Sequence, residues 1–367
     1  MKIKSKPEDF YVKEIIDLDK KEPGNKYRYF ILWKKNMNTI NAIKLIAKKF
    51  RISKKRIYFA GEKDKETVSE QYIAIENLDE FKEEYNFGNV RLKYVGSFND
   101  PLRISDIKYN YFKIVIRDVS KDEKERFLEN LNIFKEYFFN YFDEQRFGSR
   151  LNNHLIGKEI IKRNWEEAIK ILLTDYKFER NLEAIKARSW LKENWGNFKE
   201  ALKYFPKYLD VEIAVLNSLI LKKDYKKAFK SIHKRLVKLF LHAYQSYIWN
   251  LSLSEFIRKN SRTYKEIDLK IMKLIITDEI DKFKGKTWPL IGYNINHEFI
   301  EEILKMEGID KNMLYFRDQR SLTLISKSRN ILEKVYDLNY KVSDDTIVLE
   351  FKLSRGSYAT MFIKHLF

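Results

Sequence analysis

The 367-residue chain contains no cysteine and few histidines. Without cysteine, the chain has no disulfide bond, no thiolate zinc site and no cysteine nucleophile. The histidines are scattered and show no HExxH-like pair: His154, His233, His242, His297 and His365. We therefore expect no metal site, although a magnesium site built only from carboxylates stays open at this point.

Long apolar runs are also missing, because no stretch reaches the roughly 20 residues that a membrane-spanning helix needs. The N-terminal residues 1–6 show no signal peptide and lead directly into sequence that looks folded. Hydrophobic residues make up 44% and charged residues 34% of the chain, which is typical of a soluble globular protein. We expect a cytoplasmic protein with no membrane association, long enough for two domains.

Acidic residues are too few to balance the basic ones. The chain has 72 Lys and Arg against 53 Asp and Glu, so its net charge is +19 at pH 7. Such an excess most often serves to attract a polyanion. Nucleic acid is the leading candidate for that polyanion, and an anionic membrane surface is the rival.

The stretch of residues 58–75 is the centre of the sequence. Apolar residues at 57–60 and 72–75 predict two short strands, joined by a polar connection that opens with Gly61. Asp64 stands in this connection between Lys63 and Lys65. A solvated loop tip is the ordinary interpretation. The alternative is a carboxylate that neighbouring cations keep ionised, and an ionised carboxylate can act as a nucleophile.

This stretch resembles the signature of the TruD family of tRNA pseudouridine synthases, Gly-x-Lys-Asp-(Lys/Arg)-x-x-x-(Thr/Ser)-x-Gln. The matching residues are Gly61, Lys63, Asp64, Lys65, Ser69 and Gln71. In that family the Asp of the motif is the catalytic nucleophile. The resemblance therefore implies that Asp64 is the nucleophile here.

The N-terminal segment is similar to the family's Pro-Glu-Asp-Phe-x-Val-x-Glu, which stands here from Pro7 to Glu14. Family members carry a Lys a few residues upstream, and that Lys pairs with the catalytic Asp. The resemblance implies Lys4 for this role, with Lys6 close enough to compete for it. The Phe of the motif lines the uridine pocket in the family, which implies Phe10.

Two further motifs contribute to the implied pocket. Alternating apolar residues at 112, 114 and 116 predict a half-buried strand. The strand resembles the family's Asn-x-Phe-x-(Ile/Leu)-x-(Ile/Leu)-Arg, which implies Asn110 in the active site and Phe112 stacked on the target base. The alternative for this aromatic strand is an ordinary core strand. The C-terminal Gly-Ser-Tyr-Ala-Thr at 356–360 resembles another family motif and implies Tyr358 as a wall of the pocket.

Residues 140–148 read Asn-Tyr-Phe-Asp-Glu-Gln-Arg-Phe-Gly. They match the family's Asn-Tyr-Phe-Gly-x-Gln-Arg-Phe-Gly except at Asp143, where Gly is usual. Asp is among the better substitutes for Gly in a turn. Arg146 either contacts phosphate or holds the loop together. Five motifs thus occur in the family's order.

The pattern of elements predicts an α+β fold. Strands dominate residues 1–150 and 315–367, with helices expected at 38–50 and 81–87 and a C-terminal strand at 347–353 that joins the same sheet. Residues 151–314 form amphipathic helices. We predict a mixed, largely antiparallel catalytic domain (1–150 and 315–367) that a mainly helical inserted domain (151–314) interrupts.

The predicted function is isomerisation of a uridine in tRNA, by resemblance uridine 13, to pseudouridine by a monomeric enzyme without cofactor or metal. The sequence leaves open whether Asp64 attacks the sugar or the base. A non-catalytic RNA-binding protein is the first alternative, although it has little use for an acid among phosphates. A metal-dependent nuclease is the second, and it would need clustered carboxylates, of which only Glu62 and Glu66 lie near Asp64.

Overall fold

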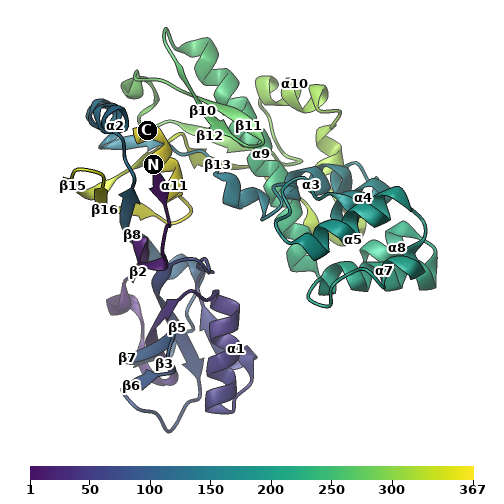
Figure 1. Ribbon diagram of the computed structural model, residues 1–367, viewed down its shortest axis with the longest axis horizontal. Coiled ribbons are helices and arrows are strands. Elements are labelled where there is room, and N and C mark those ends of the chain that lie inside the picture. Colours follow the sequence, from purple (N-terminus) through teal and green to yellow (C-terminus); the bar gives the residue numbers. More distant parts are fainter. The chain divides into compact units, whose positions relative to one another are not determined.

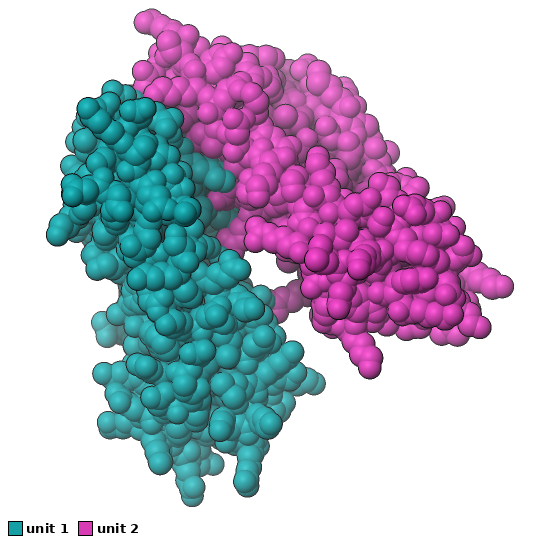
Figure 2. Space-filling model, in the orientation of Figure 1, with its two compact units in different colours: residues 1–138, 333–367 teal, residues 139–332 magenta.

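The computed structural model describes residues 1–367, which form two compact units (Figure 2). Unit 1 consists of Met1–Phe138 and Glu333–Phe367, and unit 2 of Phe139–Leu332. The chain passes between the units within two short strands, β9 (Tyr137–Phe139) and β14 (Leu332–Lys334). Unit 2 is therefore a single segment that interrupts unit 1.

The division between the units differs from the predicted boundaries at 150/151 and 314/315. It lies at 138/139 and 332/333, so residues 139–150 and 315–332 belong to unit 2. The hydrogen bonds of this segment explain the difference. The hydroxyl of Tyr141 donates to the carbonyl of Ile275 (2.6 Å), and the amide N–H of Phe142 donates to the side-chain oxygen of Asn250 (2.9 Å).

Unit 1 is built on a ten-stranded mixed sheet, in which only the pair β2–β5 is parallel (Figure 1). The largely antiparallel sheet and its helices confirm the predicted α+β class. Two further strands pair with members of the main path: β1 (Lys2–Ile3) with β8, and β4 (Ile57–Phe59) with β5. The order along the main path is β15 (Tyr336–Val342), β16 (Ile347–Ser354), β8 (Ile107–Arg117), β2 (Phe10–Ile16), β5 (Val68–Glu76), β3 (Pro23–Lys35), β7 (Val90–Phe98) and β6 (Glu84–Asn86).

The C-terminal strand β16 joins this sheet because its alternating apolar residues need a partner surface. Ile347, Leu349, Phe351 and Leu353 are fully buried. In the register of β16 and β8, Phe351 lies opposite Phe112. The C-terminal strand was predicted to join this sheet, and it does so by pairing with β8.

Two of the helices in unit 1 cover the same face of the sheet. Helix α1 (Thr39–Phe50) is capped by Asn38, whose side chain accepts from the N–H of Asn41 (2.8 Å), and it packs on Phe30 and Leu32. Helix α11 (Ala359–Leu366) packs on β16 through Phe362 and Phe351, whose ring centroids lie 4.9 Å apart. The remaining helix is α2 (Lys121–Phe134), which contacts α11.

The predicted helix at residues 81–87 is wrong. This segment contains the strand β6 (Glu84–Asn86), which pairs with β7 through Tyr85 opposite Leu92. Phe81, Tyr85 and Phe87 pack against the cluster that contains Phe30. The pairing of β6 with β7 therefore outweighs the local spacing of apolar residues, which favours a helix.

Unit 2 is mainly helical and centres on the long helix α9 (Lys234–Asn260), which contacts α3 (Asn153–Ile161) and the strands β11 and β12. At the contact with α3, a Cβ atom on Gly157 would lie 2.1 Å from the carbonyl oxygen of Phe240, so only glycine allows this approach. No helix of the structure is long and apolar enough to cross a bilayer. The other helices are α4 (Trp165–Thr174), α5 (Leu182–Glu193), α6 (Phe198–Ala201), α7 (Asp210–Lys222), α8 (Tyr225–Phe229) and α10 (Glu298–Met306). Two antiparallel strand pairs complete the unit: β10 (Lys265–Leu269) with β11 (Met272–Ile276), and β12 (Thr287–Leu290) with β13 (Lys327–Asn330).

Candidate active site

The loop that carries Asp64 lies between β4 and β5, which pair as an antiparallel hairpin as predicted. Hydrogen bonds hold its backbone in place. Nζ of Lys34 donates to the carbonyl oxygens of Lys63 (3.3 Å) and Asp64 (2.8 Å), and the side-chain amide of Gln71 donates to the carbonyl of Gly61 (2.9 Å). Since Lys34 and Gln71 are fully buried, the loop is anchored to the interior and is more than a solvated tip.

The hydroxyl of Thr39, at the start of α1, connects two of these anchors. Its Oγ1 accepts from the backbone N–H of Lys63 (2.9 Å) and donates to the side-chain oxygen of Gln71 (2.7 Å). Helix α1 therefore fixes the residue next to Asp64. This contact of Thr39 with the motif loop was not predicted from the sequence.

Asp64 forms an ion pair with Lys4, the residue that the family resemblance implied. Nζ of Lys4 lies 3.0 Å from Oδ2 of Asp64, and the two side chains are 24% and 35% exposed. The carboxylate is thus paired with a cation and still reachable from solvent. The geometry thus assigns the implied pairing to Lys4.

An ion pair with a buried carboxylate positions the N-terminal segment that carries Lys4. The carboxylate of Asp9, only 1% exposed, accepts from Nε of Arg117 (3.0 and 3.1 Å) and from Nη2 (2.8 Å). Two-pronged contacts of this kind fix orientation as well as distance. The short strand β1 adds a second attachment, because Lys2 lies opposite Arg117 in its pairing with β8.

Lys34 is a buried cation that the sequence analysis missed. It continues the inward-facing positions of β3 after Phe30 and Leu32, and none of its surface is exposed. Burial lowers the pKa of its ammonium group to about 8, while the carboxylate of Asp64 acts in the opposite direction. The signal in the sequence was a lysine at a position where the alternation of the strand requires an apolar residue.

This lowered pKa predicts a pH dependence of stability. The unfolded chain retains the proton of Lys34 up to its ordinary pKa of 10.5, whereas the folded protein releases it near pH 8. Because the unfolded state binds more protons between these values, the free energy of unfolding should rise with pH in this window, by up to about 3 kcal/mol. Urea unfolding at pH 7 and pH 10 measures this change. In Lys34→Met the Lys34 contribution should be absent, and an equal pH response in both proteins would contradict the prediction.

Glu14 is a second buried charged residue next to the motif loop. Its side chain is 0% exposed, its Oε1 lies 2.5 Å from Nζ of Lys63, and its Oε2 accepts from the N–H of Tyr72 (3.1 Å). The sequence analysis recognised Glu14 as part of a motif but assigned it no role. The sequence signal that could have revealed its role is an acid at an inward-facing position of an alternating strand. The contacts show that it ties Lys63, the neighbour of Asp64, to β5.

Asn110 lies opposite Glu14 in the pairing of β2 with β8, at the Lys63 end of the site. Its side-chain oxygen is buried and has no hydrogen-bond partner. A buried acceptor without a partner costs about 1–3 kcal/mol, so such groups often occur where a ligand binds. This residue can therefore accept a hydrogen bond from a bound molecule.

Phe10 and Phe112 are largely core residues. They are 6% and 8% exposed, and their rings meet edge-to-face at 6.2 Å. Phe112 also stacks on Phe351 at 5.5 Å, and Nζ of Lys4 lies 4.5 Å from the centre of the Phe10 ring. The structure thus brings together Lys4, Asp64, Phe10 and Phe112.

Tyr358 lies at the N-terminus of α11, after a turn in which Gly356 adopts a φ of +89°. Helix α11 covers the face of the sheet that carries Phe351, and Phe112 and Glu14 point to the same face. Tyr358 therefore lies on the Asp64 side of the sheet. It is half-buried, and the contacts above do not include its ring.

The motif at residues 140–148 lies in unit 2. Asp143, which replaces the family's Gly, has a φ of −86° and caps the short helix Glu144–Phe147 by accepting from the N–H of Glu144 (2.8 Å). This conformation suits Asp, so the replacement causes no strain. Nε of Arg146 donates to the hydroxyl of Ser246 on α9 (2.9 Å), which is a contact that holds the loop.

The comparisons with known proteins agree with these observations. A family model described as "tRNA pseudouridine synthase D (TruD)" matches residues 1–366. "Probable tRNA pseudouridine synthase D" of Nanoarchaeum equitans is 38% identical over 100% of this chain and 98% of its own length. The "tRNA pseudouridine synthase D" of Aquifex aeolicus is 35% identical, with the same two coverages.

A crystal structure of a TruD protein from Methanosarcina mazei is similar to this fold with a TM-score of 0.72 and 27% sequence identity. The match covers 99% of this chain and 92% of the other. Because a family model, close relatives and a solved structure each match nearly the whole chain, the chain belongs to the TruD family of pseudouridine synthases, which are isomerases.

Proposed function

We propose that this protein isomerises a uridine of tRNA to pseudouridine, with Asp64 as the nucleophile. The observation that carries the proposal is the ion pair of Lys4 and Asp64 on an anchored loop. An acid in this setting is paired with a cation, accessible and fixed in place, which suits a nucleophile. The relatives, whose names specify tRNA, support the choice of substrate.

The reaction needs no group beyond those of the chain and the RNA. The uridine is turned out of its stack, at a cost of a few kcal/mol that phosphate contacts offset. Asp64 attacks either C1′ of the ribose or the uracil ring, and the N1–C1′ bond breaks with its electron pair left on the uracil. The base rotates and C5 bonds to C1′. The bond to Asp64 breaks, and its electron pair returns to the carboxylate. The proton of C5 is lost while N1 gains one, so that the product is an isomer of the substrate.

The pocket residues have separate tasks in this proposal. Lys4 pairs with the Asp64 carboxylate and holds it in place, and the unpartnered oxygen of Asn110 accepts the N3–H of uracil. Phe10 and Phe112 present their exposed edges to the base, and Tyr358 closes the pocket from the start of α11. Uridine 13 is the proposed target because the chain resembles a family with that specificity.

Incubation with unmodified tRNA tests the proposal against its two alternatives. We expect pseudouridine, mapped by carbodiimide labelling and primer extension, in buffer with Mg²⁺ and equally in buffer with EDTA. Binding without any reaction would favour a non-catalytic RNA-binding protein. Cleavage that requires Mg²⁺ would favour a nuclease. The structure contains no cluster of three or more His, Asp or Glu side chains that could hold a metal ion.

The affinity for tRNA should fall steeply with salt. The net charge of +19 provides many cations for phosphate contacts. Each neutralised phosphate adds about 0.7 to 0.9 to the slope of log affinity against log salt concentration. Fluorescence anisotropy with labelled tRNA at several KCl concentrations measures this slope. A flat response would show that the positive charge does not serve RNA binding.

A further inference from the structure

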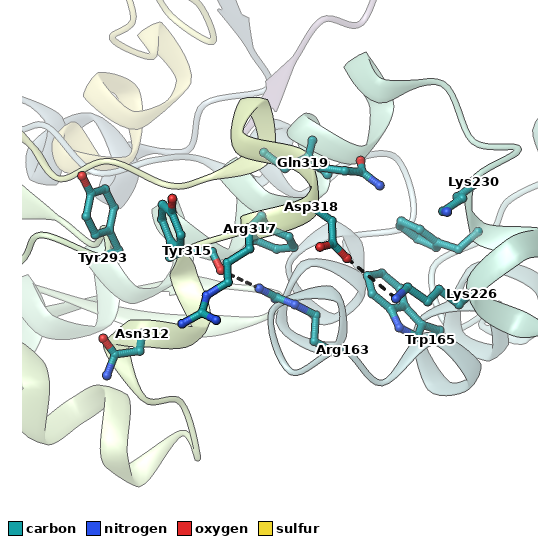
Figure 3. A pocket seen from close by; sticks show the side chains of 13 residues that line it. Arg163, Trp165, Lys226, Lys230, Tyr293, Asn312, Tyr315, Arg317, Asp318 and Gln319 are labelled. Atoms are coloured by element: carbon teal, nitrogen blue, oxygen red, sulfur yellow. Dashed lines mark hydrogen bonds and ion pairs between the residues drawn. The ribbon is translucent and has the colours of Figure 1, made fainter.

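A cavity of about 810 Å³ lies within unit 2, and none of the residues of the candidate active site in unit 1 lines it. Its walls come from the turn between α3 and α4, from α8 and the residue after it, and from residues 312–322, which include the short helix Arg317–Leu322 (Figure 3). Its volume lies in the range of small-molecule and cofactor pockets. It can therefore hold a group of the size of a nucleotide.

Aromatic rings form much of this cavity. The rings of Tyr293 and Tyr315 lie side by side, 5.3 Å apart and tilted by 56°, and Tyr293 is 43% exposed (Figure 3). On the opposite wall Trp165 packs against Phe229 at 5.1 Å. The exposed tyrosine offers an accessible ring face, which is what a planar base needs for stacking.

Cations surround these rings. The lining residues include four cations, Arg163, Lys226, Lys230 and Arg317, against one acid, Asp318. Lys226 lies 3.9 Å from Asp318, but the two side chains are 56% and 85% exposed, so the pair is weak. Lys230 and Arg317 form no ion pair. The cavity therefore carries an uncompensated positive charge that complements an anion.

Arg163 is fixed at this site without a carboxylate partner. Its Nη1 donates to the carbonyls of Ile160 (3.2 Å) and Ile161 (2.6 Å), and its Nη2 to the carbonyl of Tyr315 (2.9 Å). The guanidinium lies 3.6 Å from the centre of the Phe316 ring. Neutral carbonyls orient the group but leave its charge in place, so it adds a preorganised cation to the cavity.

We propose that this cavity binds an unpaired nucleotide of the substrate RNA, with the base stacked on Tyr293 and a phosphate held by Arg317. Rings beside a positively charged groove are the usual composition of a single-strand binding site. An acidic peptide would match the charge but would leave the exposed ring face without a planar partner. The inference rests on the proposed function, since it assigns the same RNA a second contact in unit 2.

Binding of unmodified tRNA to the full-length chain tests the inference, with Asp64→Asn as the parent so that no turnover occurs. Tyr293→Ala should weaken binding about tenfold at every salt concentration, because loss of one base stack has about that effect. Arg317→Ala should also weaken binding and should lower the log–log salt slope by about 0.7 to 0.9, because one phosphate contact is lost. Arg317→Lys should restore most of the slope.

Two matched variants outside the cavity serve as controls. Tyr208→Ala removes a tyrosine that is 56% exposed, and Arg262→Ala removes an exposed arginine, and both residues lie in unit 2. Both should bind tRNA as the parent does. Affinities of Tyr293→Ala and Arg317→Ala within twofold of the parent would overturn the inference and leave a non-RNA ligand for the cavity.

Pseudouridine formation by the unaltered chain is measured separately. If no pseudouridine forms but the two cavity variants lose affinity for tRNA, the proposed function fails while the second RNA contact stands. If pseudouridine forms and the cavity variants bind tRNA normally, the inference fails alone. Ultraviolet crosslinking adds a direct readout, since peptides that contain Tyr293 or Tyr315 should carry RNA adducts.

Discussion

Asp64→Asn should lower pseudouridine formation by at least about a thousandfold while tRNA affinity stays within about twofold of the unaltered protein. Removal of a nucleophile that acts with its neighbours causes losses of this size or larger. Asn matches Asp in shape and can still accept from Lys4 at 3.0 Å, so the loop should keep its position. Single-turnover assays with excess enzyme measure the chemical step.

Glu66→Gln is the matched control for this variant. Glu66 is an exposed acid on the same loop, two residues from Asp64, and its replacement removes the same charge. Its activity should stay within about threefold of the unaltered protein. If Asp64→Asn turns over substantially, or if Glu66→Gln loses as much activity, Asp64 is not the nucleophile.

Glu14→Ala should destabilise unit 1 and loosen the motif loop. The substitution leaves the ammonium of Lys63 and the N–H of Tyr72 without their partner in a site where Glu14 is 0% exposed. Removal of one member of a buried ion pair costs about 3–5 kcal/mol. Urea unfolding measures the loss. Hydrogen exchange of the peptide that contains Tyr72 locates it, and exchange there should accelerate.

Two controls separate the buried charge from other effects. Glu14→Gln keeps the shape and an acceptor for Tyr72, so it should cost less than Glu14→Ala. Glu70→Ala removes an acid of β5 whose pair with Lys13 spans 3.7 Å, with 45% of Lys13 and 25% of Glu70 exposed. That loss should stay below about 1 kcal/mol. Equal losses for Glu14→Ala and Glu70→Ala would show that burial of the pair does not matter.

The motif hairpin and the return of the C-terminal strand to the sheet could be predicted from the sequence. The hairpin is encoded in adjacent residues, and the strand in the alternation of Ile347, Leu349, Phe351 and Leu353. Both signals depend on local periodicity, which a single sequence displays. The pairing of Lys4 with Asp64 spans 60 residues, and it came from family resemblance and not from spacing.

The supports of the site could not be predicted in the same way. Lys34 and Glu14 occupy inward positions that a periodic pattern assigns to apolar residues, and their partners come from other strands. A charged residue inside a sheet is explained only when the tertiary contacts that satisfy it are known. The unit boundaries differ from the predicted domain boundaries for a related reason, because the contacts of Tyr141 and Phe142 with the rest of unit 2 do not appear in local composition.

The interruption of unit 1 by unit 2 has a consequence for synthesis on the ribosome. Strand β8 receives β16 as its neighbour only after the 194 residues from Phe139 to Leu332 have been made. At the usual 5–20 residues per second this takes about 10–40 s. During that interval one edge of β8 has unpaired backbone groups, and unpaired edges promote aggregation. Because Tyr358 and α11 follow β16, the nascent chain cannot complete the proposed uridine pocket until these residues have been made.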